Sequence, residues 1–407
     1  MAWVHIASHT DGDVRLCCMS NRFVKDENGE NYNLGKSSIE TILNSQDYKN
    51  IRQDMLDGKP ITGCESCYIA EKYSNTSHRT QYILKWYGNK SFKNKLNQSI
   101  ENKNIDSTIE FVDLRFGNLC NLSCRYCFSE VSYTYNKEAK EINDNYKKII
   151  FANTNKDYNS WYNTETFNNS VYEQIPNLEK YYAAGGEPTL IDKNYEFMSY
   201  MVSSKHSEHI ELQISTNLTN TKKDFYSLLP YFKKVTFLAS IDGVGAIQEY
   251  TRYPSSWKHI DNNFRKVVAL PNNNINITIT PVLQKVNLEY ITDLFEYAES
   301  FNREHNSPKV TVAPIILNQP SYYDFSYLPI DYKKQCLDKI NEWVKTKCKY
   351  QDPLFHTRLK TIREKCIEIV DYQDNLKEFF KYTDIFDIHR NHYLKDINPT
   401  LAYLRDK

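Results

Sequence analysis

The sequence predicts an α/β protein built around a parallel sheet. Six short apolar runs have the length and pattern of strands: residues 109–115, 178–183, 210–215, 234–240, 275–282 and 310–316. Helical segments alternate with these runs, and strands that alternate with helices form parallel sheets through crossover connections. With 407 residues, the chain exceeds one minimal domain and accommodates two or three compact units.

Composition narrows the functional classes. The 51 basic and 51 acidic residues balance, which disfavours a broad electrostatic surface for nucleic acid. No apolar run has the length of a membrane-spanning helix, and the start of the chain has no signal-peptide pattern. Seven of the ten cysteines lie in close sets, which without a secretion signal favours metal or cluster ligation over disulfides. We therefore expect a cytoplasmic protein in a reducing setting.

Residues 1–88 are predicted to form a small N-terminal module. Residues 5–8 and 13–19 have the pattern of two strands that flank a turn. Cys17 and Cys18 stand at the end of the second strand. The module therefore begins with a hairpin that carries two adjacent thiols.

Two helices and a second cysteine pair complete this module. Residues 37–40 form a capping box that opens the first helix, and Ser45 caps a second helix that stops at Gly58. Cys64 and Cys67 follow in a Cys-x2-Cys spacing. The two cysteine pairs are thus predicted on short, locally folded elements.

The remainder divides into a linker, a core and an extension. Residues 89–107 are polar without an apolar period and are interpreted as a linker. The core spans residues 108–325. Within it, the polar segment 129–174 exceeds an ordinary connection and is interpreted as an inserted helical excursion and a candidate substrate contact. Residues 326–407 show helical periodicity and are interpreted as a helical C-terminal extension.

Three cysteines directly follow the first predicted core strand. Cys120, Cys124 and Cys127 have a Cys-x3-Cys-x2-Cys spacing on one short loop. Three thiolates bind three corners of a cubic iron–sulfur cluster and leave the fourth iron open, whereas a four-cysteine structural site leaves nothing open. The loop therefore predicts a cluster whose fourth ligand comes from elsewhere.

Polar motifs end the next three predicted strands. They are Gly185-Gly186-Glu187-Pro188, Ser215-Thr216-Asn217, Ser240-Ile241-Asp242-Gly243 and, further along the chain, Arg252. Active sites of parallel barrels lie at the carboxyl ends of strands, and glycines let the backbone approach a ligand closely. Taken singly, the first two motifs are compatible with turns, Asp242 with a cap and Arg252 with a solvated helix residue.

Together with Tyr126 before the last cysteine of the loop, these motifs resemble the signature of radical S-adenosylmethionine (SAM) enzymes. The resemblance implies a partial (β/α)6 TIM-like barrel and a [4Fe–4S] cluster on Cys120, Cys124 and Cys127, with SAM on the open iron. It implies that the residues in contact with SAM are Gly185, Gly186, Glu187, Ser215, Asn217, Ser240, Asp242 and Arg252. It also implies reduction by flavodoxin or ferredoxin, and cleavage of SAM to methionine and a 5′-deoxyadenosyl radical that abstracts a substrate hydrogen.

The N-terminal module resembles the SPASM/twitch modules of such enzymes, which hold an auxiliary iron–sulfur cluster. The resemblance implies that its ligands are Cys17, Cys18, Cys64 and Cys67. Here, however, the module precedes the core, and no cysteine shortly follows Gly35. The fourth ligand would then be the second of the adjacent cysteines, an outside residue such as His78, or substrate. Zinc is the alternative occupant, because four cysteines also satisfy a tetrahedral zinc ion.

Three functions remain after this reading. Enzymes with such modules often modify ribosomally made peptides, so a peptide or protein substrate is our first expectation. A small molecule, such as a sugar or nucleotide, is the second. A non-catalytic zinc-binding interaction protein is the alternative from another class, and the motifs at successive strand ends argue against it.

Overall fold

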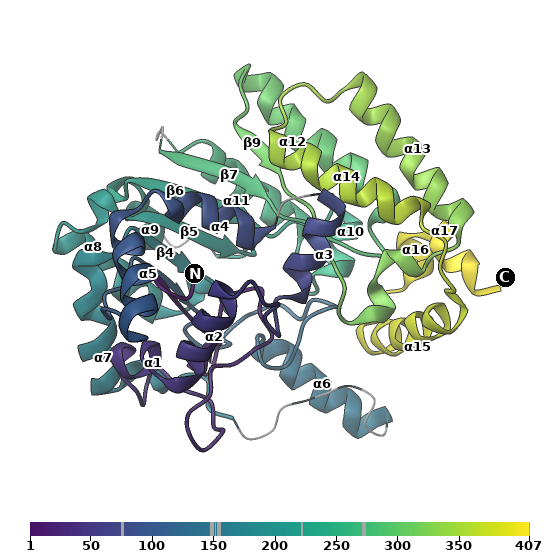
Figure 1. Cartoon of the computed structure of the whole chain (residues 1–407). Helices are drawn as coiled ribbons and strands as arrows, with labels where there is room; N and C mark the ends of the chain where they lie inside the picture. Colours follow the sequence, from purple (N-terminus) through teal and green to yellow (C-terminus); the bar gives the residue numbers. More distant parts are fainter. Residues whose placement is uncertain are drawn as a thin grey trace. The chain divides into compact units, whose positions relative to one another are not determined.

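The computed structural model describes residues 1–74, 77–146, 150, 152, 156–220, 223–270 and 274–406 (Figure 1). The chain divides into two compact units. Unit 1 consists of Met1–Leu119, Thr154–Ser215 and Lys222–Thr236, and unit 2 consists of Cys120–Asn153, Thr216–Thr221 and Phe237–Lys407. Each unit is therefore assembled from segments that lie far apart in the sequence. The segment 129–174 contributes to both units and falls partly outside the described residues.

Unit 1 contains a sheet that is parallel except at one edge. Its strands are β1 (His5–Ser8), β2 (Val14–Arg15), β3 (Phe111–Leu114), β4 (Lys180–Ala183) and β5 (Glu211–Thr216). β1 pairs antiparallel with β2 and parallel with β3, and the pairs β3–β4 and β4–β5 are parallel. Three predicted core strands thus form β3, β4 and β5, and the N-terminal hairpin extends the same sheet.

One face of this sheet packs on α8 (Asp192–Ser203). Val112 pairs with Ile6 on one side and Tyr181 on the other, and all three side chains are fully buried. The Tyr181 and Phe197 rings meet edge to face with centroids 5.1 Å apart, a favourable arrangement for two aromatic rings. The core of unit 1 therefore includes the contact between the sheet and α8.

The remaining helices of unit 1 include the predicted pair near the N-terminus. They are α1 (Ile39–Leu43), α2 (Gln46–Leu56), α3 (Glu65–Ser74), α4 (His78–Tyr87), α5 (Lys90–Asn102), α7 (Glu165–Val171) and α9 (Lys223–Ser227). Ser38 accepts a hydrogen bond from the main-chain N–H of Thr41, and Ser45 accepts one from that of Tyr48. The predicted cap at Ser45 is thus confirmed, whereas the first helix is capped by Ser38, one residue after the Ser37 that the predicted capping box implies. The segment 89–107, interpreted as a linker, contains α5.

Unit 2 holds the later strands of the predicted core. β7 (Ile275–Ile279) pairs parallel with β9 (Val310–Val312), and β8 (Val282–Leu283) pairs parallel with β10 (Ile315–Ile316). β6 (Lys234–Ala239) is divided between the units. The runs predicted at 275–282 and 310–316 are each split into two strands. Pro281 and Pro314 stand at the breaks, because proline has no N–H to donate to a strand ladder.

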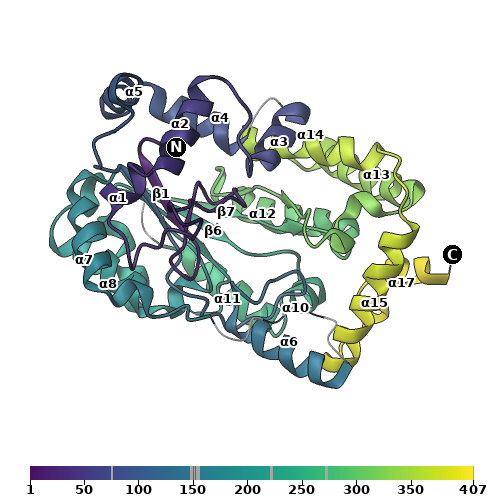
Figure 2. The same cartoon turned by 60° about the horizontal axis from the view of Figure 1, so that its bottom comes forward.

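The helices of unit 2 surround these strands and form the C-terminal extension. They are α6 (Tyr133–Tyr146), α10 (Ala246–Thr251), α11 (Trp257–Val268), α12 (Ile291–His305), α13 (Ile330–Thr346), α14 (Pro353–Ile367), α15 (Gln373–Arg390), α16 (Leu394–Ile397) and α17 (Pro399–Tyr403). α12, α13 and α14 lie side by side (Figures 1 and 2), with Phe295, Trp343 and Phe355 packed between them. Trp343 is therefore a core residue.

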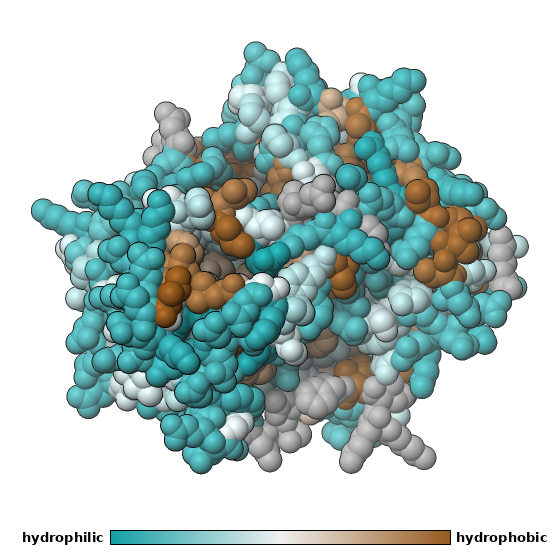
Figure 3. Space-filling model, in the orientation of Figure 1, coloured by the Kyte–Doolittle hydropathy of each residue, from teal (hydrophilic) through white to brown (hydrophobic). Residues whose placement is uncertain are grey.

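The mostly parallel sheet and the many helices confirm the predicted α/β class. The face of the molecule in Figure 3 is mainly hydrophilic, with hydrophobic side chains gathered in separate patches. No helix in the described part of the chain combines the length and the apolar character that crossing a membrane requires.

Candidate active site

The two glycines after β4 pack against the start of the cysteine loop. A Cβ on Gly186 would lie 2.2 Å from the carbonyl oxygen of Leu119. The main-chain N–H groups of Gly186 and Glu187 donate to the carbonyls of Gly117 and Leu119, at 3.3 and 2.7 Å. Position 186 therefore requires glycine because it lies against the chain that leads into Cys120. The sequence alone pointed to an approach to a ligand.

Two other predicted site residues of unit 1 have partners within that unit. Glu187 is buried, and its Oε1 accepts hydrogen bonds from the N–H and hydroxyl of Thr189 at 3.1 and 2.6 Å. Glu187 thus caps the short turn that follows it. The hydroxyl groups of Ser215 and Tyr182 lie 2.9 Å apart.

Unit 2 brings the three cysteines of the loop together. The main-chain N–H of Cys127 donates to the carbonyl of Cys124 at 2.9 Å, which closes a tight turn. Burial raises the pKa of the Cys127 thiol, and the neighbouring thiols of Cys124 and Cys120 raise it further. The amide Nδ2 of Asn217 lies 3.8 Å from the Sγ of Cys120. The thiols therefore form one group with a hydrogen-bond donor beside it.

Asp242 is the centre of a buried polar network beside this loop. Its carboxylate accepts hydrogen bonds from Nη2 of Arg252 at 3.0 Å, from the hydroxyl of Tyr126 at 2.5 Å and from the N–H of Val282 at 2.8 Å. Nε of Arg252 lies 2.9 Å from the second carboxylate oxygen. Charge-assisted bonds of this kind are strong in a buried setting. Because Tyr126 lies between Cys124 and Cys127, the network fixes the loop.

Main-chain bonds also tie the loop to the end of α10. The N–H groups of Ser123 and Arg125 donate to the carbonyls of Tyr253 and Thr251, at 2.6 and 3.0 Å. Among these residues, Arg252 was a predicted site residue, its neighbours Thr251 and Tyr253 were not, and Tyr126 was predicted only as part of the cysteine motif. A main-chain hydrogen bond does not depend on the type of residue, so the sequence does not indicate the contact between the loop and the end of α10. The aromatic residue before the last cysteine is the one sequence feature near it.

Ser240, the remaining predicted residue, contributes through its main chain, whose N–H donates to the carbonyl of Thr216 at 2.9 Å. The predicted site residues are therefore distributed over both units. Unit 2 holds Cys120, Cys124, Cys127, Asn217, Ser240, Asp242 and Arg252, and unit 1 holds Gly185, Gly186, Glu187, Ser215 and the four N-terminal cysteines.

The segments that carry the N-terminal cysteines lie side by side in unit 1. Gly63 has a φ of +89°, and a Cβ there would lie 2.7 Å from Oγ of Ser20. The hydroxyl of Ser66 donates to the carbonyl of Met19 at 3.4 Å. The turn before α3 is thus packed against the turn that follows β2.

The adjacent cysteines differ in their surroundings. Burial raises the pKa of Cys64 to about 11, and the thiols of Cys17 and Cys67 raise it further. Burial also raises the pKa of Cys18, and Asp113 is the largest charged contributor. After burial, the charged contributors to the raised pKa of Cys17 are Cys67 first and Asp113 second. His78, the outside candidate, stacks on Tyr82 with ring centroids 6.2 Å apart.

The donors of both sets are thiols only, which fits the ligands of iron–sulfur clusters. Among the described residues, no group of three or more His, Cys, Asp and Glu side chains is arranged so that it could hold a metal ion. Gly186, Tyr126 and Asp242 fix the backbone on which the first set stands. Although the side chains of these described residues are not arranged to hold a single metal ion, they fit a cluster by their donor chemistry and by the buried contacts that fix the loop.

Two protein families match the chain. Residues 114–298 match the radical SAM superfamily, and residues 1–68 match the SPASM family, described as an iron-sulfur cluster-binding domain. The first match begins within β3 and covers the cysteine loop and the strand-end motifs. The second covers the four N-terminal cysteines. No curated protein matches the sequence.

Solved structures show distant similarity. SuiB of Streptococcus suis bound to S-adenosylmethionine has 13% identity and a TM-score of 0.42, covering 80% of this chain and 67% of its own. SuiB bound to the precursor peptide SuiA has 12% identity and a TM-score of 0.38, covering 76% and 68%. Native anSMEcpe with bound AdoMet has 16% identity and a TM-score of 0.35, covering 58% and 60%. The chain thus spans about three fifths to two thirds of these structures.

Proposed function

Because the chain belongs to the radical SAM superfamily and carries a SPASM iron–sulfur domain, we propose that it generates a 5′-deoxyadenosyl radical to modify a peptide or protein. The observation that carries this proposal is the grouping of Cys120, Cys124 and Cys127 on a loop held by buried contacts. A rigid loop with three thiols suits a cluster that must keep one iron open.

The loop cysteines would hold a [4Fe–4S] cluster, with SAM at the open iron. When reduced, this cofactor pair supplies a 5′-deoxyadenosyl radical and methionine; the protein orients the pair and excludes water. Asn217 points its amide at the Cys120 sulfur, where a donor N–H stabilises negative charge. Asp242 orders Tyr126 and Arg252. We propose that the surface for SAM comprises Gly185, Gly186, Glu187, Ser215, Asn217, Ser240, Asp242 and Arg252.

An auxiliary iron–sulfur cluster is proposed at the N-terminal cysteines. The thiols of Cys17 and Cys67 add to the effect of burial on the pKa of Cys64, which supports a three-cysteine ligand set. For Cys18, Asp113 contributes more to the raised pKa than the thiol of Cys17 does. The fourth position would then be available to substrate or another ligand. Such a cluster would accept the electron released when a substrate radical is oxidised.

The peptide substrate is proposed from the SPASM domain, because modules of this type often accompany peptide modification. A flavodoxin or ferredoxin of a reducing cytoplasm is the proposed electron donor. The charge balance of 51 basic and 51 acidic residues gives no support to a nucleic-acid partner.

The experiment is anaerobic purification followed by measurement of iron, sulfide and zinc, and of 5′-deoxyadenosine after reduction in the presence of SAM. We expect two clusters per chain and SAM cleavage. A variant with Cys120, Cys124 and Cys127 changed to Ala should lose cleavage and retain the iron of the N-terminal site. A zinc-only protein without SAM cleavage would contradict the proposal. Iron that disappears entirely in the triple variant would contradict the auxiliary cluster.

A further inference from the structure

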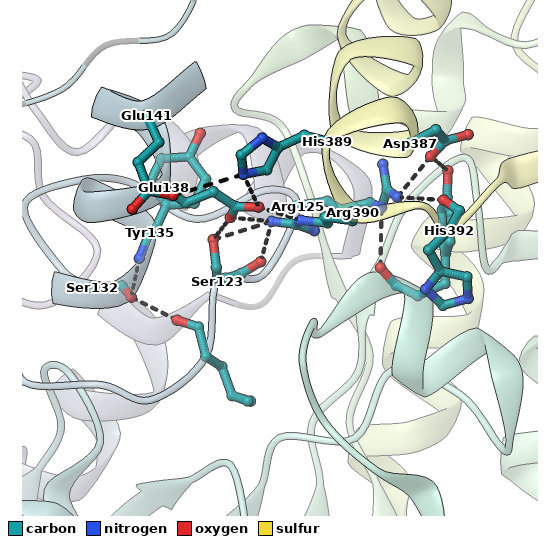
Figure 4. Close-up of polar contacts among 12 residues, drawn as sticks. Ser123, Arg125, Ser132, Tyr135, Glu138, Glu141, Asp387, His389, Arg390 and His392 are labelled. Carbon is teal, nitrogen blue, oxygen red and sulfur yellow. Dashed lines mark hydrogen bonds and ion pairs between the residues drawn. The ribbon is translucent and has the colours of Figure 1, made fainter. Parts of the chain in front are cut away.

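The end of α15 meets the cysteine loop through two fully buried arginines (Figure 4). The first is Arg125, which lies between Cys124 and Tyr126. Its Nη2 donates to Oδ1 of Asp387 at 2.7 Å, and its guanidinium carbon lies 3.6 Å from the centre of the Tyr250 ring. The Tyr250 hydroxyl donates to the same Asp387 oxygen at 2.7 Å.

The second buried arginine is Arg390, in the last turn of α15. Its Nε and Nη2 donate to the two carboxylate oxygens of Glu138 at 2.7 and 2.6 Å, a two-pronged pair. Nη2 also donates to the carbonyl of Ser123 at 2.7 Å. The Ser123 hydroxyl donates to Glu138, which lies on α6. Figure 4 shows the two arginines between the loop and the helix.

These contacts hold both neighbours of the middle cysteine. Ser123 and Arg125 flank Cys124, and each is bonded to a residue of α15 more than 250 positions later in the chain. Any displacement of α15 would therefore reach Cys124 through two adjacent peptide units.

Holding α15 in place does not by itself require these charges. α6 and α15 lie side by side in Figures 1 and 2, and an apolar cluster already joins them. Its buried members are Tyr135, Ala139, Ile142, Ile150, Ile385 and Phe386. Buried ion pairs are expensive to desolvate and add little to stability over a well-packed apolar contact. What they add here is a defined geometry and a balanced charge beside the loop.

We propose that Asp387 and Arg390 are positioning residues for the radical-generating centre: through Arg125 and Ser123 they fix Cys124 and balance the charge near the cluster. This inference rests on the proposed function. It assigns to the C-terminal extension a role in SAM cleavage, although none of its residues need touch SAM.

Because each substitution changes the charge near the cluster, each should change the midpoint potential of the cluster in a defined direction. Asp387→Asn keeps an acceptor oxygen for Arg125 but leaves that cation uncompensated. Because reduction adds negative charge to a cluster, its midpoint potential should rise. Arg390→Gln removes the cation that pairs with both oxygens of Glu138 and, among the described ion pairs, leaves only that with His389, whose Nε2 lies 3.8 Å from Oε1, so the potential should fall. A general loosening of the loop would not move the two variants in opposite directions.

The test uses the anaerobically purified holoenzyme at pH 8. The cluster of the loop is identified as the one whose electron paramagnetic resonance signal changes when SAM is added, and its midpoint potential is measured by titration. In Arg390→Gln, the rate of 5′-deoxyadenosine formation should fall by up to about 100-fold, because small misplacements of reacting groups reduce rates by this factor. The KM for SAM should change less than kcat. Arg390→Lys should recover part of the rate.

The matched control is Asp384→Asn, on the same helix. Asp384 pairs with Arg405, and both side chains are more than 40% exposed, so potential and rate should stay at wild-type values. If Asp387→Asn does not fold, Glu138→Gln replaces it, because it also removes a negative charge and should raise the potential. Unchanged potentials, or shifts of one sign only, in variants with an intact cluster would overturn the inference. A wild-type protein without cluster or SAM cleavage would instead overturn the proposed function.

Discussion

The two cysteine sets of this chain are held in different ways. The loop of residues 120–127 is fixed by distant residues. The main-chain N–H groups of Ser123 and Arg125 donate to carbonyls at the end of α10. The Ser123 carbonyl accepts from Arg390 of α15, and the Arg125 guanidinium donates to Asp387 of α15. The N-terminal set stands on local turns. The N–H of Cys67, for example, donates to the carbonyl of Cys64 at 3.0 Å. The first set is held by contacts with α10 and α15, and the second by contacts between its own two turns.

The two cysteine sets should therefore be disturbed by different substitutions. Substitutions far from the loop in sequence should disturb the first set, because its backbone depends on buried polar partners. The second set should respond chiefly to changes inside its own turns. Cys64 also borders a cavity of about 440 Å³ that Met55, Ile61 and Trp86 help to line, so its surroundings are less densely filled.

The largest expected effect comes from Asp242→Ala. This change removes the acceptor shared by Tyr126, Arg252 and Val282. Removing one partner of a buried ion pair leaves the other charge uncompensated and costs about 3–5 kcal/mol. Urea unfolding of the cluster-free chain should show this loss, and the holoenzyme should lose SAM cleavage.

The control for Asp242 is an exposed carboxylate in the same unit. Asp384→Ala removes an ion pair whose members are both substantially exposed, and such pairs contribute about 0–1 kcal/mol. Equal losses of stability in the two variants would show that the network around Asp242 does not hold the loop.

The next effect is expected from Gly186→Ala. The added Cβ would lie 2.2 Å from the carbonyl oxygen of Leu119, so the chain before Cys120 must move. Overpacking of this kind costs about 1–3 kcal/mol. We expect 5′-deoxyadenosine formation to fall at least tenfold, while iron at the N-terminal cysteines is retained.

Gly88→Ala is the matched control, because a Cβ at Gly88 has no neighbour within 4 Å. It should leave both the iron content and the rate at wild-type values. A Gly186→Ala enzyme that is as active as Gly88→Ala would mean that the contact with Leu119 is not tight in solution.

Gly63→Ala applies the same test to the N-terminal set. Gly63 has a φ of +89° and its Cβ would meet Ser20. A left-handed conformation costs an ordinary residue about 1–2 kcal/mol. The iron of the auxiliary site should be lost or reduced, whereas reductive cleavage of SAM should persist because the loop does not depend on this turn. Loss of cleavage in Gly63→Ala would remove the distinction between the two sites.

The same contrast explains what could be predicted from the sequence. Alternating apolar runs and helix caps are local patterns, so β3, β4, β5 and the cap at Ser45 were predictable, and the cap of α1 was predicted one residue early, at Ser37. The splitting of two strands at Pro281 and Pro314 is also a local effect, because proline has no N–H to donate to a strand ladder.

The contacts of the loop could not be predicted in this way. Arg125 and Asp387 are 262 positions apart, and a sequence contains many charged residues that could pair with either. The strand-end motifs indicated that Asp242 and Arg252 serve one site. That these two bind each other, and that Tyr126 joins them, depends on side-chain placement that neither spacing nor composition contains.

The smallest expected effect separates the adjacent cysteines of the N-terminal set. Beyond burial, the thiol of Cys17 raises the pKa of Cys64, whereas Asp113 is the largest charged contributor to the raised pKa of Cys18. Cys17→Ser should therefore lose auxiliary iron, and Cys18→Ser should keep it, as measured by iron and sulfide per chain in the background of the triple-alanine variant of the loop. Equal losses would make both cysteines ligands and complete a four-thiol set. The opposite result, with loss only in Cys18→Ser, would mean that binding of the cluster reverses the turn after β2.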